Sequence, residues 1–223
     1  MKHQSIYFLF LTHSKINPMC FHTQLTEALP KIEKRFAATM EQPSLFQPQN
    51  HINGFAFPQT PVITDRAPEI ITHYHWGLIP AWAKEESIRS YTLNAKIETL
   101  SEKPSFKNSV QKRCLVLANG FYEWQWLDPK GKQKQQYRIG LPEQELFALA
   151  GLYSQWVDTA TGEIRNTYTL LTTEANALMA EIHNNKKRMP VVLHQEDEHK
   201  WLQGEAVEHF AFPYAVDLIA SRL

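Results

Sequence analysis

The stretch RCLVLANGFYEWQW, residues 113–126, decides the fold that the sequence predicts. Its first half is almost entirely apolar, and its second half alternates aromatic with other side chains, as short β-strands do. Runs of this kind predict strands at 113–118, 120–126, 135–139, 146–156 and 166–173. The segments 128–131 (DPKG) and 158–162 (DTATG) carry residues typical of tight turns. Strands joined by such turns form hairpins, so we expect an antiparallel sheet.

The regions outside these strands predict helices and shorter strands. Apolar residues at three- or four-residue spacing predict an amphipathic helix within 23–40, broken or begun at Pro30. Two prolines in 53–64 favour short edge strands and a tight turn over a central strand. A second helix is expected at 174–183, capped by Thr172 or Thr173. Towards the end of the chain we expect a short strand at 191–193 and the start of an acidic helix near 195–201. The sequence thus predicts a single α+β domain built on antiparallel β-sheets with flanking helices.

Length and charge exclude several classes of protein. The chain has 223 residues, with 23 Lys and Arg against 23 Asp and Glu, so it is long enough for a core without disulfides. A neutral chain does not coat DNA or membranes by bulk charge, and any nucleic-acid contact must come from a local patch. Two cysteines are too few for a disulfide framework and indicate a reducing compartment, the cytoplasm. The apolar run at 6–11 is too short to span a bilayer.

Glu123 is the first candidate for chemistry, because it lies among rings in GFYEW, residues 120–124. If buried, its carboxyl group would have a raised pKa and suit general acid catalysis. Its spacing alone favours the alternative, a glutamate on the surface of a sheet beside a core stripe.

His183 and Asn94 are candidates with equally ordinary alternatives. His183 ends the predicted helix and precedes the cations Lys186 to Arg188, so it is either a catalytic or a capping histidine. Asn94, in LNAKIET, offers an amide but suits a helix cap as well. His73 and His75 have no accompanying cysteine pair, so we expect no metal site and no cofactor.

Seven segments, in order, resemble the SOS response-associated peptidase (SRAP) family. They are WGLIPAW (76–82), LNAKIET (93–99), RCLVLANGFYEW (113–124), ALAGLYSQW (148–156), TTEAN (172–176), IH (182–183) and KRMPVVL (187–193). Each segment is weak alone, but their order over residues 19 to 193 is specific. The resemblance implies a barrel-like core of β-sheets and an activity on abasic sites in single-stranded DNA.

The resemblance also implies how the chain would react. Family members crosslink the abasic sugar to a cysteine that is exposed as the new N-terminus, which implies that Met19 is the functional start and Cys20 the nucleophile. An amine and a thiol on one terminal cysteine convert an aldehyde into a thiazolidine ring. With reference pKa values of about 7.7–8.0 and about 8.5, both groups have reactive fractions near neutral pH. We therefore expect residues 1–18 to be a leader or a mis-assigned start and 19–223 to form the domain.

Residue roles transfer by position. Asn94 is implied to position the opened sugar, Glu123 to orient the cysteine amine and shuttle protons, and His183 to act as acid or base in ring opening and crosslinking. The resemblance implies DNA contacts for the following side chains: Pro58 on a wedge loop, Trp76 and Trp124 against bases, and Lys96, Lys187 and Arg188 at phosphates. Cys114 is expected to be an inert core thiol.

Three departures from the family pattern limit this transfer. Phe21 and His22 follow the cysteine where Gly and Arg are common, which removes one phosphate contact. Lys96 stands where many members have arginine, so the bidentate fork is lost. Four residues, 184–187, separate His183 from Arg188 instead of one.

The expected function is a covalent sensor of abasic sites that releases its own leader by peptidase activity, and that binds damaged DNA at the nucleoid as a monomer without membrane contact. Two alternatives from other classes are open at this stage. One is a cysteine hydrolase that uses Cys20 and His183 as nucleophile and base. The other is a non-catalytic single-strand binder that relies on tryptophan, lysine and arginine.

Overall fold

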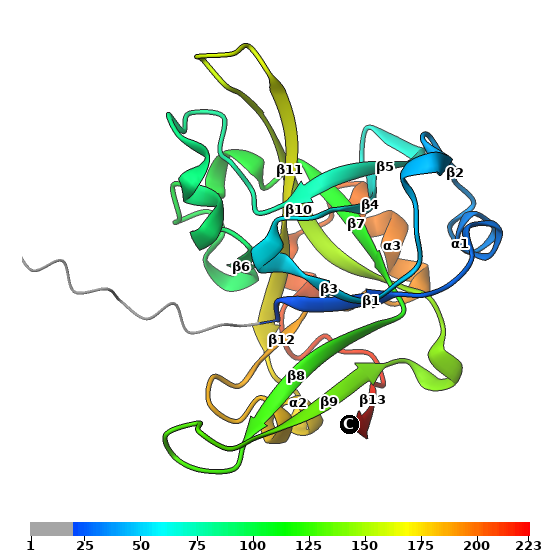
Figure 1. Cartoon of the computed structure of the whole chain (residues 1–223), viewed down its shortest axis with the longest axis vertical. Helices are drawn as coiled ribbons and strands as arrows, with labels where there is room; N and C mark the ends of the chain where they lie inside the picture. The colour runs from blue at the N-terminus through cyan, green and yellow to red at the C-terminus, as the bar shows by residue number, and fades with distance from the viewer. Residues whose placement is uncertain (1–19) are drawn as a thin grey trace, which may run out of the picture.

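The computed structural model describes residues 20–223, which form two sheets with short helices around them (Figure 1). In spatial order, one sheet contains β13 (Ile219–Arg222), β9 (Lys134–Gly140), β8 (Gly120–Trp126), β1 (His22–Leu25) and β3 (Gln49–Asn53). The larger sheet contains β12 (Arg188–Pro190), β11 (Ile164–Glu174), β10 (Phe147–Val157), β7 (Arg113–Ala118), β4 (Gln59–Thr64), β5 (Ala67–Trp76) and β2 (Thr39–Met40), and β6 (Asn94–Lys96) pairs with β11. The α+β fold class predicted from the sequence is confirmed.

One additional pairing closes the larger sheet into a barrel. Thr167 and Tyr168 of β11 pair in parallel with His75 and Trp76 of β5. The ring β5, β4, β7, β10 and β11 therefore has no free edge, as expected for a closed barrel. Both predicted hairpins are present, β8–β9 and β10–β11, and their pairing is antiparallel. The parallel pairs, β11 with β5 and β6 and β2 with β5, were not predicted.

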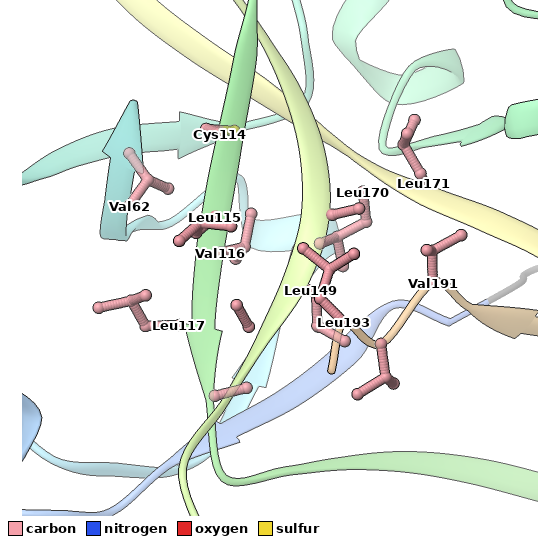
Figure 2. Packing of buried hydrophobic residues seen from close by; sticks show 14 of the residues in the cluster. Val62, Cys114, Leu115, Val116, Leu117, Leu149, Leu170, Leu171, Val191 and Leu193 are labelled. Carbon is pink, nitrogen blue, oxygen red and sulfur yellow. The ribbon is translucent and has the colours of Figure 1, made fainter. Parts of the chain in front are cut away.

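The barrel interior holds the apolar core (Figure 2). Every residue of β7 is buried, and Val116 pairs with Leu149 of β10 on one side and with Val62 of β4 on the other. A strand with neighbours on both sides and side chains packed on both faces reads as a continuous apolar run, which is why RCLVLA shows little alternation. Cys114 is fully buried in this strand, as expected of a core thiol.

The helix predicted within 23–40 begins beside Pro30, as one of its two expected arrangements has it, but residues 23–28 and 37–40 are not helical. Residues 23–25 belong to β1, where Thr23 pairs with Phe121 of β8 and with Ile52 of β3. The helix itself, α1, spans only Leu29–Phe36 and carries Pro30 in its first turn, where a missing N–H costs nothing. Tertiary pairing on both edges of β1 outweighs the helical spacing of its apolar residues.

The prediction of edge strands at 53–64 is also wrong, because β4 lies between β5 and β7. Pro61 is opposite His73 of β5, whereas the pairing with β7 begins only at Val62. The proline therefore occupies a strand position that has a neighbour on one side only, which lets an interior strand tolerate it.

The remaining helices cover the sheets. Helix α2 (Ala177–Ile182) packs against β8, and α3 (Glu198–Leu202) packs against β7. The side chain of Asn176, rather than the predicted Thr172 or Thr173, caps α2 by accepting a hydrogen bond from the Met179 backbone N–H at 2.9 Å. The predicted strand at 191–193 is shifted to β12 at 188–190. Among residues 20–223, no helix is long and apolar enough to cross a membrane.

Candidate active site

Cys20 lies two residues before the start of β1 and is 3% exposed. Its backbone N–H donates a 2.8 Å hydrogen bond to Oε1 of Glu123. Burial, and then the neighbouring charge of Glu123, raises the pKa of the Cys20 thiol well above its ordinary value. Cys20 also has a φ of 40°, in the left-handed region that L-residues rarely adopt. The nitrogen and the thiol of this residue therefore share one carboxylate as their neighbour.

Glu123 is buried in β8 and is 5% exposed, so the sheet-surface glutamate favoured by its spacing is wrong. The cause is tertiary: β1 and β9 pair with β8 on its two sides, and α2 packs against it. Burial raises the pKa of this carboxyl group, although His183 and the hydrogen bonds from Cys20 oppose the rise. A raised pKa in a buried carboxyl is the property that general acid–base work requires.

His183 follows the last residue of α2 and is 2% exposed. Its Nδ1 lies 2.8 Å from the backbone carbonyl oxygen of Arg188. A carbonyl can only accept, so Nδ1 carries the proton and, in the neutral ring, Nε2 is the free base. Nε2 lies 4.0 Å from Oε2 of Glu123. The two oxygens of one carboxylate thus face the cysteine nitrogen and the imidazole.

These three residues line a pocket of about 240 Å³. The pocket is also lined by Phe21, His22, Phe55, Trp124, Trp126, Lys134 and Asn185. Of these, only Trp124 was among the predicted site residues. Trp126 lies two positions from Trp124 on the same strand, so the period of two would have identified it. His22, Phe55, Lys134 and Asn185 come from separate segments and carry no local signal.

Arg188 is 8% exposed, which does not agree with the predicted phosphate contact. Its guanidinium makes two hydrogen bonds to the Glu98 carboxylate, at 3.0 and 2.7 Å, and one to the Thr172 carbonyl at 2.6 Å. Burial alone would raise the pKa of Glu98, but the hydrogen bonds from Arg188 lower it. Arg188 therefore holds β12 against β11 and places the carbonyl that fixes His183. The neighbouring Lys187 is exposed.

Trp76 was predicted to contact bases, but it is fully buried. Its indole N–H donates a 2.8 Å hydrogen bond to the Leu93 carbonyl, and its ring stacks on Tyr168. The backbone of Gly54 lies against the same ring, where an added Cβ would be 3.1 Å from it. Trp76 therefore has no face available to a base in this structure.

Asn94 and Lys96 lie on β6, in register with Leu170 and Thr172 of β11. Asn94 is half-buried and Lys96 is exposed, and neither is among the residues that line the pocket. The expectation of a helix-capping role for Asn94 is not met, because it begins a strand. Of the predicted site residues, the structure thus brings Cys20, Glu123, His183 and Trp124 to one pocket, but not these two.

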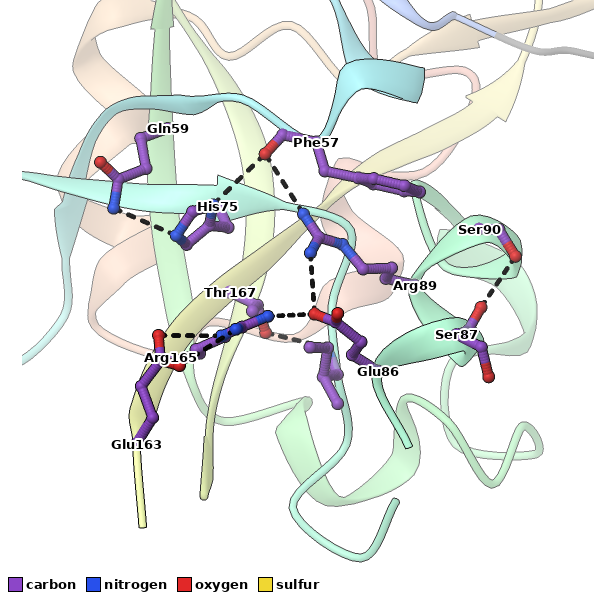
Figure 3. A network of polar contacts seen from close by, with 11 residues as sticks. Phe57, Gln59, His75, Glu86, Ser87, Arg89, Ser90, Glu163, Arg165 and Thr167 are labelled. Atoms are coloured by element: carbon purple, nitrogen blue, oxygen red, sulfur yellow. Dashed lines mark hydrogen bonds and ion pairs between the residues drawn. The ribbon is translucent and has the colours of Figure 1, made fainter. Parts of the chain in front are cut away.

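Pro58 follows Phe57, whose position a polar network fixes (Figure 3). The Phe57 carbonyl accepts a hydrogen bond from Nη2 of Arg89 at 3.2 Å and lies 3.3 Å from Nδ1 of His75. The Arg89 guanidinium also lies over the Phe57 ring, 3.9 Å from its centroid. Glu86 links Arg89 to Arg165 of β11. The loop before β4 is therefore anchored to the barrel.

Within residues 20–223, no group of three or more His, Cys, Asp and Glu is placed to hold a metal ion. His73 and His75 lie on β5, and His75 contacts Gln59 at 3.1 Å.

Comparisons with known proteins agree on one family. Residues 19–219 match the family described as SOS response associated peptidase (SRAP). Abasic site processing protein YoqW of Bacillus subtilis (strain 168) is 48% identical over 142 residues, which make up 63% of this chain and 61% of that protein. Abasic site processing protein HMCES of Xenopus tropicalis is 33% identical over 161 residues, 62% of this chain and 46% of that protein. The matches thus span less than two thirds of the length of these relatives.

A solved structure extends the agreement to nearly the whole fold. The crystal structure of a protein from Bacteroides thetaiotaomicron is 34% identical, has a TM-score of 0.83, and the match covers 92% of both chains. Sequence and structure give the same assignment: this chain belongs to the SOS response associated peptidase (SRAP) family.

Proposed function

We propose that this protein senses abasic sites in single-stranded DNA and crosslinks them covalently through the amine and thiol of Cys20. The observation that carries the proposal is the hydrogen bond between the Cys20 nitrogen and Glu123, at the wall of a pocket that also contains His183. A site that holds the nitrogen as well as the sulfur of one cysteine suits chemistry that uses both. The relatives named abasic site processing proteins support the same substrate.

The proposed reaction balances with the loss of one water. The ring-opened abasic sugar presents an aldehyde, whose carbon the free amine of Cys20 attacks. Loss of the aldehyde oxygen as water gives an imine. The thiol sulfur then adds to the same carbon, its proton passes to the nitrogen, and a five-membered thiazolidine results. A neutral thiol is sufficient for this last step because the imine nitrogen accepts the thiol proton as the carbon–sulfur bond forms.

Glu123 and His183 have complementary roles in this scheme. The Glu123 carboxylate accepts a proton from the attacking amine and returns it when water leaves, which its raised pKa favours. His183 has Nε2 free to take the proton of the C1′ hydroxyl of the cyclic sugar. The C1′–O4′ bond then breaks, O4′ takes the proton back, and the open-chain aldehyde results. Asn94 is proposed to orient the opened sugar once DNA is bound, with Trp124 against a neighbouring base and Pro58 at the kinked strand.

The phosphate contacts are proposed for the exposed cations of this region. Lys96 and Lys187 are exposed, whereas the charge of Arg188 is paired with Glu98. We assign Arg188 a positioning role instead, through its carbonyl bond to His183.

The proposal requires cleavage of the peptide bond between Met19 and Cys20, because an amide nitrogen does not attack an aldehyde. Residues 1–19 lie outside the described residues, so the expected leader is itself part of the proposal. The left-handed φ of Cys20 fits a bond that is broken, since such conformations are costly for L-residues and concentrate at functional sites. An associated peptidase activity on this bond is proposed together with the crosslinking.

The cysteine hydrolase alternative fits the site less well. A hydrolase keeps its cysteine as a thiolate next to a histidine. Here the hydrogen-bond partner of the thiol is Glu123, and both burial and the carboxylate raise the thiol pKa. This arrangement disfavours a resting thiolate.

Incubation with single-stranded DNA that carries one abasic site, followed by a denaturing gel, tests the proposal. Protein whose first residue is Cys20, verified by intact mass, should give a shifted band that Cys20→Ala lacks. Cys114→Ala is the matched control, because this second thiol is buried in β7 and should leave the band unchanged.

Two results would contradict the proposal. One is a band of equal intensity in Cys20→Ala. The other is turnover of a peptide substrate by protein that retains residues 1–19, with no crosslink after those residues are removed. The second result would establish the hydrolase instead.

A further inference from the structure

Trp126, at the end of β8, forms part of the pocket wall beside the reactive residues. Both of its backbone polar groups bond to one side chain: its N–H donates to Oδ1 of Asn184 at 3.1 Å, and its carbonyl accepts from Nδ2 of Asn184 at 2.9 Å. Asn184 belongs to the segment 184–187, which is longer here than in the family pattern. The longer loop therefore anchors this tryptophan.

The indole ring of Trp126 is supported from one side by the turn of the β8–β9 hairpin. Gly131 approaches it so closely that an added Cβ would be 2.6 Å from the ring atoms. Gly131 also has a φ of 63°, which glycine adopts without strain. Because glycine occupies one side, the ring can offer a partner only its remaining surface. The half-buried ring is thus held rigidly at the pocket.

Two polar groups accompany the ring. Nζ of Lys134 lies 5.5 Å from the indole centroid, and Lys134 also lines the pocket. Within residues 20–223, the buried side-chain oxygen of Asn185 has no hydrogen-bond partner. A buried acceptor without a partner costs free energy, which an N–H donor in the pocket would recover.

We propose that Trp126, Lys134 and Asn185 form a subsite for the nucleobase that flanks the abasic position in single-stranded DNA. The inference rests on the proposed function. The nucleotide that carries this base fits the chemistry of all three residues: the flat face of the base stacks on the indole, its N–H groups can pair with the Asn185 oxygen, and the phosphate lies within the field of Lys134.

The position of this subsite explains why it suits a neighbour of the lesion and not the lesion itself. The abasic sugar has no base to stack, and it must reach Cys20 and Glu123. The same pocket extends from these residues to Trp126 and Lys134. The next nucleotide along the strand is therefore the one whose base meets the indole.

Non-covalent binding to two DNA probes tests the inference with the expressed full chain. Both single-stranded oligonucleotides carry a central tetrahydrofuran residue, which lacks a base and cannot form the crosslink. In the first probe the flanking nucleotides have normal bases, and in the second they are also tetrahydrofuran residues. Dissociation constants are measured by fluorescence anisotropy at one fixed salt concentration.

Trp126→Ala should raise the dissociation constant of the first probe about 5- to 150-fold, the effect of losing one stacked base. The dissociation constant of the second probe, which has no flanking base, should rise less than twofold. Trp126→Phe should recover most of the first effect, because it restores a ring. Trp82→Ala is the matched control, since Trp82 is 53% exposed and lies outside the pocket, and it should bind both probes normally.

Equal weakening of both probes by Trp126→Ala would overturn the subsite. If that variant fails to fold, as judged by circular dichroism, Asn185→Ala is measured on the same probes, and equal effects on both probes again overturn the subsite. Lys134→Gln should weaken the binding of both probes alike, because both keep their phosphates, and an unchanged affinity for both would remove Lys134 from the subsite. If the wild-type protein crosslinks abasic DNA but Trp126→Ala affects the two probes equally, the subsite alone is refuted. Wild-type protein that neither crosslinks nor binds refutes the proposed function as well.

Discussion

The backbone nitrogen of Cys20 and the carboxylate of Glu123 are joined by a 2.8 Å hydrogen bond across 103 positions of sequence. The bond depends on the pairing of β1 with β8, in which Thr23 lies opposite Phe121 and Gln24 opposite Gly120. This register sets the start of the described chain beside the middle of β8. The reactive geometry is therefore a property of the sheet and not of a mobile terminus.

Glu123→Gln should stabilise the fold at neutral pH while slowing the crosslink. Because burial raises the pKa of Glu123 in the folded state, the folded protein holds a proton on this carboxyl group more tightly than the unfolded chain does. Its stabilising effect is present below the unfolded pKa and is lost as pH rises through the folded pKa. Glutamine does not titrate, so the free energy of unfolding of the variant should fall less than that of the wild type as pH rises above about 4.3, the unfolded value, as measured by urea unfolding.

The crosslinking rate of Glu123→Gln should fall about 10²- to 10⁴-fold, the usual contribution of a general acid or base. Glu69→Gln, at an exposed position of β5, is the control and should change neither the free energy of unfolding nor the crosslinking rate. A Glu123→Gln protein that crosslinks at the wild-type rate would remove Glu123 from the mechanism.

Arg188→Met should destabilise the protein by about 3 kcal/mol, the lower end of the range for a broken buried ion pair. The lower end applies because the Glu98 side chain is still 32% exposed. The double variant Arg188→Met with Glu98→Gln should recover part of the loss, since it leaves no unpaired charge. Urea unfolding of the two single variants and the double variant gives the coupling energy.

A phosphate-binding role for Arg188 predicts a different pattern. In that case Glu98→Gln would free the guanidinium and tighten DNA binding without a loss of stability. The positioning role is supported instead if each single variant lowers the free energy of unfolding and the double variant lowers it by less than the sum of the two.

The hairpins of this fold were predictable because their signals are local. The turns at 128–131 and 158–162 lie between runs whose period is that of a strand, and both hairpins form as expected. The strand β1 was not predictable, because Leu25 fits a helical spacing with Leu29 and only the flanking strands β8 and β3 decide its conformation. The interior place of β4 depends likewise on partners far away in the sequence.

The site likewise has features that the sequence predicts and features that depend on distant partners. Family resemblance brought Cys20, Glu123 and His183 together, but the spacing of residues around Glu123 favoured a surface position. Burial of this carboxylate follows from the packing of α2 and β1 on β8, which no local pattern encodes. Arg188 looked like a free cation because its partner Glu98 lies 90 positions earlier in the chain.

His22 should make the fold sensitive to acid. Burial, and then the charge of His51, lowers the pKa of His22 from 6.5 to about 4. His22 therefore becomes protonated near pH 6.5 in the unfolded chain but only near pH 4 in the folded protein. The contribution to stability is complete above pH 6.5 and is lost as pH falls towards 4.

The variant His22→Gln should show a smaller loss of unfolding free energy between pH 7 and 4.5 than the wild type. His199→Gln, at an exposed position of α3, serves as the control and should follow the wild-type curve. Nδ1 of His22 lies 2.7 Å from Nε2 of His51. If unfolding free energy depends on pH in the same way in wild type and His22→Gln, the fold does not disfavour protonation of the His22 ring.

The two tryptophans predicted to meet DNA should separate into one structural and one binding residue. Trp76 is fully buried and donates a hydrogen bond to the Leu93 carbonyl, so Trp76→Ala should cost about 3–5 kcal/mol of unfolding free energy. Trp124 is half-buried at the pocket, with its ring edge-on to His22, so Trp124→Ala should cost much less stability. The affinity of the Trp124→Ala protein for single-stranded DNA should instead fall at least about 5-fold, because a stacking surface is lost.

Urea unfolding and fluorescence anisotropy on the same preparations distinguish the two roles. Trp76→Phe is the informative companion variant, because it keeps an apolar ring in the core but loses the N–H donor. If Trp76 only supports the barrel, Trp76→Phe should lower stability and bind DNA with wild-type affinity wherever it is folded. A folded Trp76→Phe protein with weakened DNA binding would show that the barrel opens enough to expose this ring, and the base contact first expected of Trp76 would then be restored.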